Sequence, residues 1–289
     1  MPTRPTNLQT TYRYTGTTLL DPLVVYETAV YFLSHYCIYG WDQPVPGIPF
    51  RRPSSPIGFS IQRTREASRT PLRISSVFFA LLAAISVMSE QEFRALDVFI
   101  SISNRLIGVL RIFQKTPGGI LSIDNPVVLP PTSPNANASL NVGADSGIYI
   151  DPGNKYAIPY TFSPPAVPSG DIFTAIISAI IIITHYGPSS RFDSLYALSL
   201  GGNLALRIQE TSPPDTEKAF AISVVNPLLE KITTGFVMLR RFETLKFAYE
   251  EVQPDGAPRR KRLEGYFERV SNAANGQKDD GDRAGTAKA

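Results

Sequence analysis

The pattern of apolar positions predicts a chain that alternates between helices and strands. Apolar residues that recur every three to four positions predict helices over residues 22–39, 74–89 and 170–186. Alternating or β-branched runs predict strands at residues 57–63, 93–103, 106–113, 156–162, 192–200 and 203–210. A fourth helical pattern, at residues 217–241, contains Pro227 and is expected to break there, before strands at residues 243–252 and 262–270. The order of these elements indicates an α+β fold.

An internal repeat is the strongest regularity of the chain. Helix positions of residues 75–113 recur in residues 170–208 at an offset of 95: Phe78, Leu81, Leu82, Ala84 and Ile85 return as Phe173, Ile176, Ile177, Ala179 and Ile180. Leu110-Arg111-Ile112 returns as Leu206-Arg207-Ile208 at an offset of 96. Repeated units of this kind stack on one another to bury their apolar faces. We therefore expect two strand–helix–strand–strand units that superpose, preceded by the N-terminal helix and followed by a partial third copy.

The predicted elements and the composition between them divide the chain into five segments. They are a flexible arm (1–18), the N-terminal helix with the first unit (19–114), a Pro, Asn and Ser-rich loop or linker (115–145), the second unit with the partial third (146–270), and a tail (271–289). The tail has almost no large apolar side chain, so we expect it to be disordered and dispensable for folding.

The order of strand, apolar helix and strand pair resembles a class of uncharacterised α/β proteins of filamentous fungi. The resemblance rests on the helices Val77–Ile85 and Ile172–Ile180 with their following Leu-Arg-Ile strands, and it covers residues 20–270. Many members of that class look secreted, whereas the N-terminus of this chain is polar and lacks the apolar segment of a signal peptide. The resemblance implies no activity and no site residue.

Composition narrows the class of partner and the compartment. The hydrophobic fraction of 43% supports a sizeable core, and a net charge of +3 makes nucleic acid an improbable partner. Cys37 is the single cysteine, which excludes an internal disulfide and a cysteine-based metal site. The longest apolar run is shorter than the roughly 20 residues of a membrane crossing. We expect a cytoplasmic or nuclear protein without cofactor, metal or membrane span, and a secreted one only if the N-terminus is incomplete.

The two histidines and the cysteine are candidates for acid–base or nucleophilic chemistry. His35 and His185 both lie between a hydroxyl residue and a tyrosine near the end of an apolar helix. Such a pair would serve as acid and base, or each histidine caps a helix C-terminus. We favour capping. His35 and Cys37 point about 200° apart on a helix, so His35 does not activate this thiol, which we interpret as a core residue.

Charged residues supply the remaining candidates. Asp97 and Asp193 lie near the starts of equivalent strands. One interpretation is a carboxylate pair for acid–base chemistry or cation binding, and the other is two separate solvated acids. The repeat-equivalent Arg111 and Arg207 are the candidate ligand-binding residues, for an anion between the units; the alternative is that their stems shield the sheets. The basic run of Arg259, Arg260, Lys261 and Arg262 is an exposed hairpin loop or a weak nucleic-acid patch. Asn137 begins a glycosylation sequon, which matters only after export.

These observations favour an interaction protein over an enzyme. The sequence contains no phosphate loop, dinucleotide fingerprint or serine-hydrolase elbow. The predicted strands are apolar on both faces, which indicates more burial than one layer of helices provides. We therefore expect a non-enzymatic interaction or structural protein that binds a protein partner, or a second copy of itself, through sheet or loop surface. The alternative is an enzyme or small-ligand binder with its site between the two units.

Overall fold

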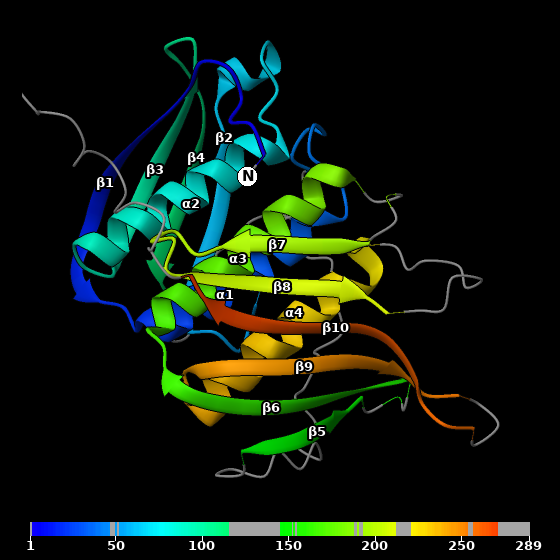
Figure 1. Cartoon of the computed structure of the whole chain (residues 1–289). Coiled ribbons are helices and arrows are strands. Elements are labelled where there is room, and N and C mark those ends of the chain that lie inside the picture. Colours follow the sequence, from blue (N-terminus) through cyan, green and yellow to red (C-terminus); the bar gives the residue numbers. More distant parts are fainter. Residues whose placement is uncertain are drawn as a thin grey trace, which may run out of the picture.

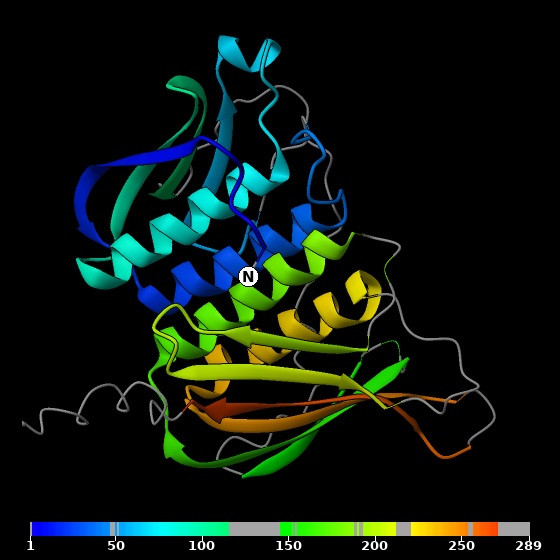
Figure 2. The ribbon, with the colours of Figure 1, turned by 45° about the horizontal axis from the view of Figure 1, so that its top comes forward.

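Across the residues that it describes, the computed structural model has two antiparallel sheets with four α-helices between them (Figures 1 and 2). It describes residues 2–46, 50, 52–115, 145–151, 153, 155–187, 190, 193–211, 221–253 and 257–270. The fold is α+β, as the sequence predicts.

The four-stranded sheet has the order β1-β3-β4-β2. Its strands are β1 (Leu8–Leu19), β2 (Ile57–Arg63), β3 (Arg94–Ile102) and β4 (Arg105–Gln114). The six-stranded sheet has the order β5-β6-β9-β10-β8-β7. Its strands are β5 (Ser146–Ile150), β6 (Tyr156–Ala166), β7 (Ser194–Leu198), β8 (Leu204–Glu210), β9 (Glu243–Glu251) and β10 (Arg260–Arg269). The helices are α1 (Pro22–Cys37), α2 (Ile74–Glu90), α3 (Ser169–Tyr186) and α4 (Ala221–Leu239), with a short 3₁₀ helix η1 (Arg65–Ser68) after β2.

The start of α1 follows the expected local chemistry. Asp21 is the N-cap, and its carboxylate accepts a hydrogen bond of 2.9 Å from the backbone N–H of Leu23. Pro22 occupies the first turn, where its missing N–H leaves no bond unmade. Val25 and Phe32 are fully buried on the face that packs into the core. Capping and the apolar stripe together fix this helix.

Residues 8–19 form β1, which corrects the expected flexible arm at residues 1–18. The segment is rich in threonine and tyrosine, and both residue types favour strands. The side chains that point to the helices include Thr10, Tyr12 and Tyr14, so the strand shows no apolar periodicity. The pairing with β3 gives the segment its structure.

Helix α4 continues through Pro227, which corrects the predicted break. The neighbouring Asn226 is buried against α1: its side-chain oxygen accepts a hydrogen bond of 2.8 Å from Ser34 Oγ, and its Nδ2 donates to the Ser34 carbonyl at 3.4 Å. Packing against α1 stabilises the helix around the proline, because tertiary contacts override a local helix breaker.

Strand order does not support the expected pairing of residues 57–113 with residues 156–208. In the first sheet β2 lies beside β4, whereas β9 and β10 separate β6 from β8 in the second. The segment expected to be a partial third copy, α4-β9-β10, therefore supplies the centre of the six-stranded sheet. Leu82 is also only partly buried while Ile177 is fully buried, so these two positions do not share a register.

A different correspondence matches both strand order and register. Residues 8–114 run β1-α1-β2-α2-β3-β4 and pair in the order β1-β3-β4-β2. Residues 156–269 run β6-α3-β8-α4-β9-β10, apart from the added β7, and pair in the order β6-β9-β10-β8. The row Tyr12, Val98, Leu110 and Ile61 in the first sheet has its counterpart in Tyr160, Phe247, Gly265 and Ile208. The Leu20 N–H bonds to the Phe93 carbonyl and the Val167 N–H to the Phe242 carbonyl, each at 2.7 Å.

Each sheet buries one face against the helices and turns the other away from them. The rows just given lie on the inner faces, and most of their residues are in the core. Helix α3 is long and apolar enough to cross a membrane by composition, and about two thirds of it is buried within the fold. Such burial is typical of a core helix.

Candidate binding surface on the six-stranded sheet

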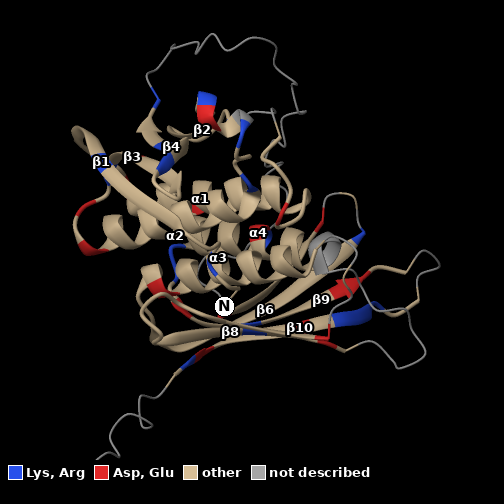
Figure 3. Ribbon diagram, turned by 90° about the horizontal axis from the view of Figure 1, so that it is seen from above, with Lys and Arg blue, Asp and Glu red and all other residues tan. Residues whose placement is uncertain are grey.

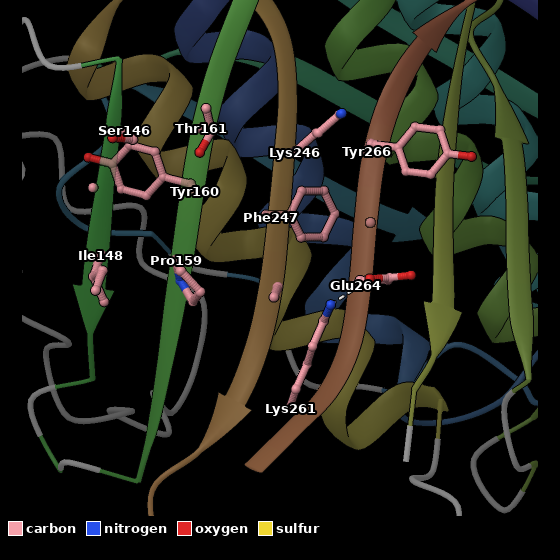
Figure 4. A pocket seen from close by; sticks show the side chains of 13 residues that line it. Ser146, Ile148, Pro159, Tyr160, Thr161, Lys246, Phe247, Lys261, Glu264 and Tyr266 are labelled. Carbon is pink, nitrogen blue, oxygen red and sulfur yellow. Dashed lines mark hydrogen bonds and ion pairs between the residues drawn. The ribbon is translucent and has the colours of Figure 1, made fainter. Parts of the chain in front are cut away.

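An open hollow of about 690 Å³ lies on the six-stranded sheet, across β5, β6, β9 and β10 (Figure 4). Its lining comprises Ser146, Gly147, Ile148, Pro159, Tyr160, Thr161, Lys246, Phe247, Ala248, Lys261, Glu264, Gly265 and Tyr266. Figure 4 shows the helices behind the strands, so the hollow is on the outer face of the sheet. We call it the sheet hollow.

Strand alternation explains which side chains surround the sheet hollow. Thr161, Lys246 and Tyr266 lie side by side on neighbouring strands, in a row that points outward. Two positions further along, Ala248 lies opposite Glu264. The small side chain of Ala248 leaves the middle of the outer face low. Longer side chains on either side therefore enclose a shallow basin.

The rim of the sheet hollow includes apolar side chains that are open to solvent. Ile148 is 49% exposed on β5 and Tyr266 is 37% exposed on β10. Tyr196 and Leu198 extend the exposed apolar surface onto β7. Within the described part of the chain, no helix packs on this face. Exposed apolar groups on one face favour contact with another molecule.

The charges of the sheet hollow are mostly paired. Lys261 lies 2.5 Å from Glu264, and Arg207, at the margin, pairs with Glu268 and lies over the Tyr196 ring at 4.7 Å. Lys246 takes part in no ion pair among the described residues. Basic and acidic residues lie side by side on β9 and β10 (Figure 3). In the described part of the chain, the surface therefore offers aromatic and apolar contacts beside an ammonium group that has no ion pair, without a large field of either sign.

Arg111 and Arg207, the expected anion-binding pair, are not brought together. Arg111 lies on the outer face of the four-stranded sheet, where its Nε is 3.6 Å from the buried carboxylate of Asp97. Arg13 approaches the same carboxylate at 3.5 Å. Arg207 is on the outer face of the other sheet, beyond the helices. In the correspondence above, Arg111 matches Tyr266 and Arg207 matches Ser60.

The histidines and the cysteine also lie apart. His35 is close to the rings of Tyr36 and Phe50, and burial lowers the pKa of its imidazole. His185 is exposed and packs edge-on against Trp41, with ring centroids 5.4 Å apart. Cys37 is buried, donates to the Ser34 carbonyl, and has a thiol pKa raised to about 12 by burial, so it is a poor nucleophile.

The other charged candidates fall on separate elements. Asp193 is exposed before β7, on the opposite sheet from Asp97. The basic run enters β10 rather than staying in a loop, and Arg262 is buried within 3.5 Å of Glu251. Asn137 and the tail 271–289 lie outside the described residues. In the described ranges, no group of three histidine, cysteine or acidic residues forms a metal site.

Sequence reasoning missed a buried polar cluster between α1 and α4. Ser34 and Asn226 bond to each other, and Glu230 lies beside Ser34. Burial raises the pKa of the Glu230 carboxyl, an effect that the Ser34 hydroxyl partly opposes. Ser34 is buried, so the cluster joins two helices without offering a surface to a ligand. The sequence also did not single out Lys246 and Tyr266. The alternation of polar and apolar residues on β9 and β10 indicates which side chains point outward, but it does not indicate where the sheet is hollowed.

Comparison with known proteins gives no relative that defines the chain. No family model matches it, and no curated protein is similar in sequence. One solved structure, the tesB protein of Mycobacterium avium subs. paratuberculosis, has 9% identity over 85% of each chain and a TM-score of 0.13. A likeness at that level carries no argument about fold or function.

Proposed function

We propose that the chain is a binding protein that holds a macromolecular partner on the outer face of its six-stranded sheet. The observation that carries the proposal is the sheet hollow, in which exposed Ile148 and Tyr266 lie on the same face as Lys246, a lysine that has no ion pair among the described residues. Aromatic residues on an open face supply contact area at low entropic cost, and a single ammonium group adds direction to binding. An open basin of this shape suits the surface of a larger molecule better than a small enclosed ligand.

The residues that supported an enzyme are distributed over two helices and two sheets. Asp97 and Arg111 meet on one outer face, His35 is partly buried on α1 and His185 is exposed at the end of α3. Within the described part of the chain, no three of these residues line the same cavity. This arrangement supports binding over acid–base or nucleophilic chemistry as the function of the protein.

Site-specific photocrosslinking in the source cells tests the proposal. A photoreactive phenylalanine analogue replaces Tyr266 in one variant and the exposed Tyr186 of α3 in a matched control. We expect a discrete crosslinked product from position 266 alone. Unlabelled wild-type protein should suppress this product, and the double variant Tyr266→Ala/Lys246→Ala should not. Equal products from both positions, or no product from position 266, would contradict the proposal.

A further inference from the structure

We propose that β1 is a strand-addition site, at which an extended segment of a partner protein pairs antiparallel with the free edge of the four-stranded sheet. The model for this pairing is β5, which occupies the corresponding edge of the other sheet. The site is distinct from the sheet hollow, so it stands independently of the proposed function.

The open edge of β1 is defined by its hydrogen-bond alternation. β1 is the terminal strand of its sheet and lies at the margin of the molecule (Figures 1 and 2). The Ser103 N–H bonds to the Asn7 carbonyl at 3.2 Å, so odd-numbered residues bond to β3. The N–H and C=O groups of Thr10, Tyr12 and Tyr14 therefore point away from the sheet. No described strand pairs with them.

The corresponding edge of the six-stranded sheet is filled. β6 matches β1 in strand order and register, with Tyr160 in the place of Tyr12. The Phe162 N–H bonds to the Asp145 carbonyl at 2.7 Å, and the Asp151 N–H to the Tyr156 carbonyl at 3.0 Å. The backbone groups of even-numbered β6 residues thus bond to β5. The backbone groups of even-numbered β1 residues point in the corresponding direction, to the open edge. The chain itself shows that this edge accepts an antiparallel strand.

The occupied edge also indicates the chemistry of the segment that β1 would accept. β5 carries no charged side chain between Ser146 and Ile150. It places Gly147 opposite Tyr160, where a Cβ would lie 2.5 Å from the tyrosine oxygen. Tyr12 holds the matching position in β1, so a small residue is required opposite it. The partner segment is therefore short and β-forming, uncharged over the five residues that correspond to Ser146–Ile150, with glycine opposite Tyr12.

The charges beside the two edges are exchanged: Arg241 and Glu243 flank Phe242, whereas Glu92 and Arg94 flank Phe93. Arg241, which precedes Phe242, lies 3.1 Å from Asp145 at the start of β5. The residue that precedes Phe93 in the first half is Glu92. Glu92 pairs with Arg94 at 2.9 Å and stays half-exposed, so at that end of an added strand it favours a basic residue over an acidic one. The best imitation of β5 for β1 is therefore a peptide with lysine in place of the aspartate.

The first seven residues of β1, Leu8 to Tyr14, lack the features that protect most edge strands. Such edges are commonly short, or carry lysine, proline or a bulge. Between Leu8 and Tyr14 the only charged residue is Arg13, whose guanidinium turns to Asp97 on the outer face. The register with β3 shifts only after Tyr14. Seven residues thus form a regular ladder with one side open.

Nuclear magnetic resonance on the ¹⁵N-labelled full chain tests the site, with the amidated peptide KSGIYI as the probe. We expect dose-dependent shifts in the amides of Thr10, Tyr12 and Tyr14. Tyr12→Pro removes an outward N–H without touching the ladder to β3, and should weaken binding about tenfold. Thr10→Pro is a second variant of the same kind, should Tyr12→Pro fail to fold. Thr11→Ala alters the same strand without changing an outward N–H, and should leave the affinity unchanged.

Three results would overturn the proposal. They are the absence of shifts at millimolar peptide, shifts confined to β6 through displacement of β5, and binding that both proline variants retain. Light scattering measures the oligomeric state of the same variants. A wild-type dimer that Tyr12→Pro dissociates would assign this edge to a second copy of the chain rather than to a partner protein. Crosslinking through position 266 is unaffected by any of these outcomes, so the two proposals fail separately.

Discussion

The ring of Tyr26 in α1 stacks on the ring of Phe173 in α3, with centroids 5.2 Å apart and planes at 14°. Each ring also meets a phenylalanine of its own half edge-on, Phe93 at 5.4 Å for Tyr26 and Phe242 at 6.2 Å for Phe173. Tyr26 and Phe173 hold corresponding positions five residues after the helix caps Asp21 and Pro168. Corresponding residues that touch each other are the signature of a twofold contact between matching surfaces.

Truncation of this stack should weaken the whole fold. Tyr26→Ala and Phe173→Ala should each lower the free energy of unfolding by about 3–5 kcal/mol, because each leaves a large cavity between the helices. A double-mutant cycle in urea should give a coupling of about 0.5–1.5 kcal/mol. Tyr186→Ala, at the exposed end of α3, is the control and should change stability by less than about 0.5 kcal/mol. Strictly additive losses would show that the rings do not interact.

Two glycines should respond oppositely to the same substitution. A Cβ at Gly265 would lie 2.4 Å from the Phe247 ring and 2.8 Å from the Arg207 carbonyl, so Gly265→Ala should destabilise the protein by about 1–3 kcal/mol. A Cβ at Gly235 of α4 meets nothing within 4 Å. Gly235→Ala should therefore stabilise the helix by roughly 0.5–1 kcal/mol. Thermal melts of both variants measure the difference, and an equal effect at the two sites would contradict this account of the sheet.

Local pattern predicted the helices and most strands, but not their arrangement. Asp21 and the apolar stripes define α1, α2 and α3, because these signals depend on near neighbours. The insertion of β9 and β10 between β6 and β8 depends on pairing between distant segments, which a local pattern does not contain. The repeat at an offset of 95 reflects two apolar helices of similar composition. β1 was missed because its inward positions are threonine and tyrosine.

The sheet hollow was beyond sequence reasoning for a related reason. Tyr266 and Lys246 are ordinary outward residues of two strands until the register places them side by side. Arg111 and Arg207 share a sequence context, yet they lie on opposite sides of the helical layer. A matching tripeptide therefore did not indicate a matching place.

Core truncations distinguish the observed helix registers from the expected one. Ile177 and Leu81 are fully buried, whereas Leu82 is partly buried at the margin of the core. Ile177→Ala and Leu81→Ala should each lower the free energy of unfolding by about 2–5 kcal/mol. Leu82→Ala should have a clearly smaller effect in the same urea titration. A loss at Leu82 as large as that at Ile177 would restore the register predicted at an offset of 95.

The imidazole of His35 should make stability depend on pH below neutrality. Burial against Phe50 lowers its pKa in the folded protein, while the unfolded chain keeps a value of about 6.5. The unfolded state therefore binds more protons as pH falls through 6.5, and the folded state loses stability until pH drops below the folded pKa. His35→Phe removes this term, so its stability relative to wild type should be greater at pH 5 than at pH 8. Parallel profiles for wild type and His35→Phe would show that this histidine is not desolvated in the folded protein.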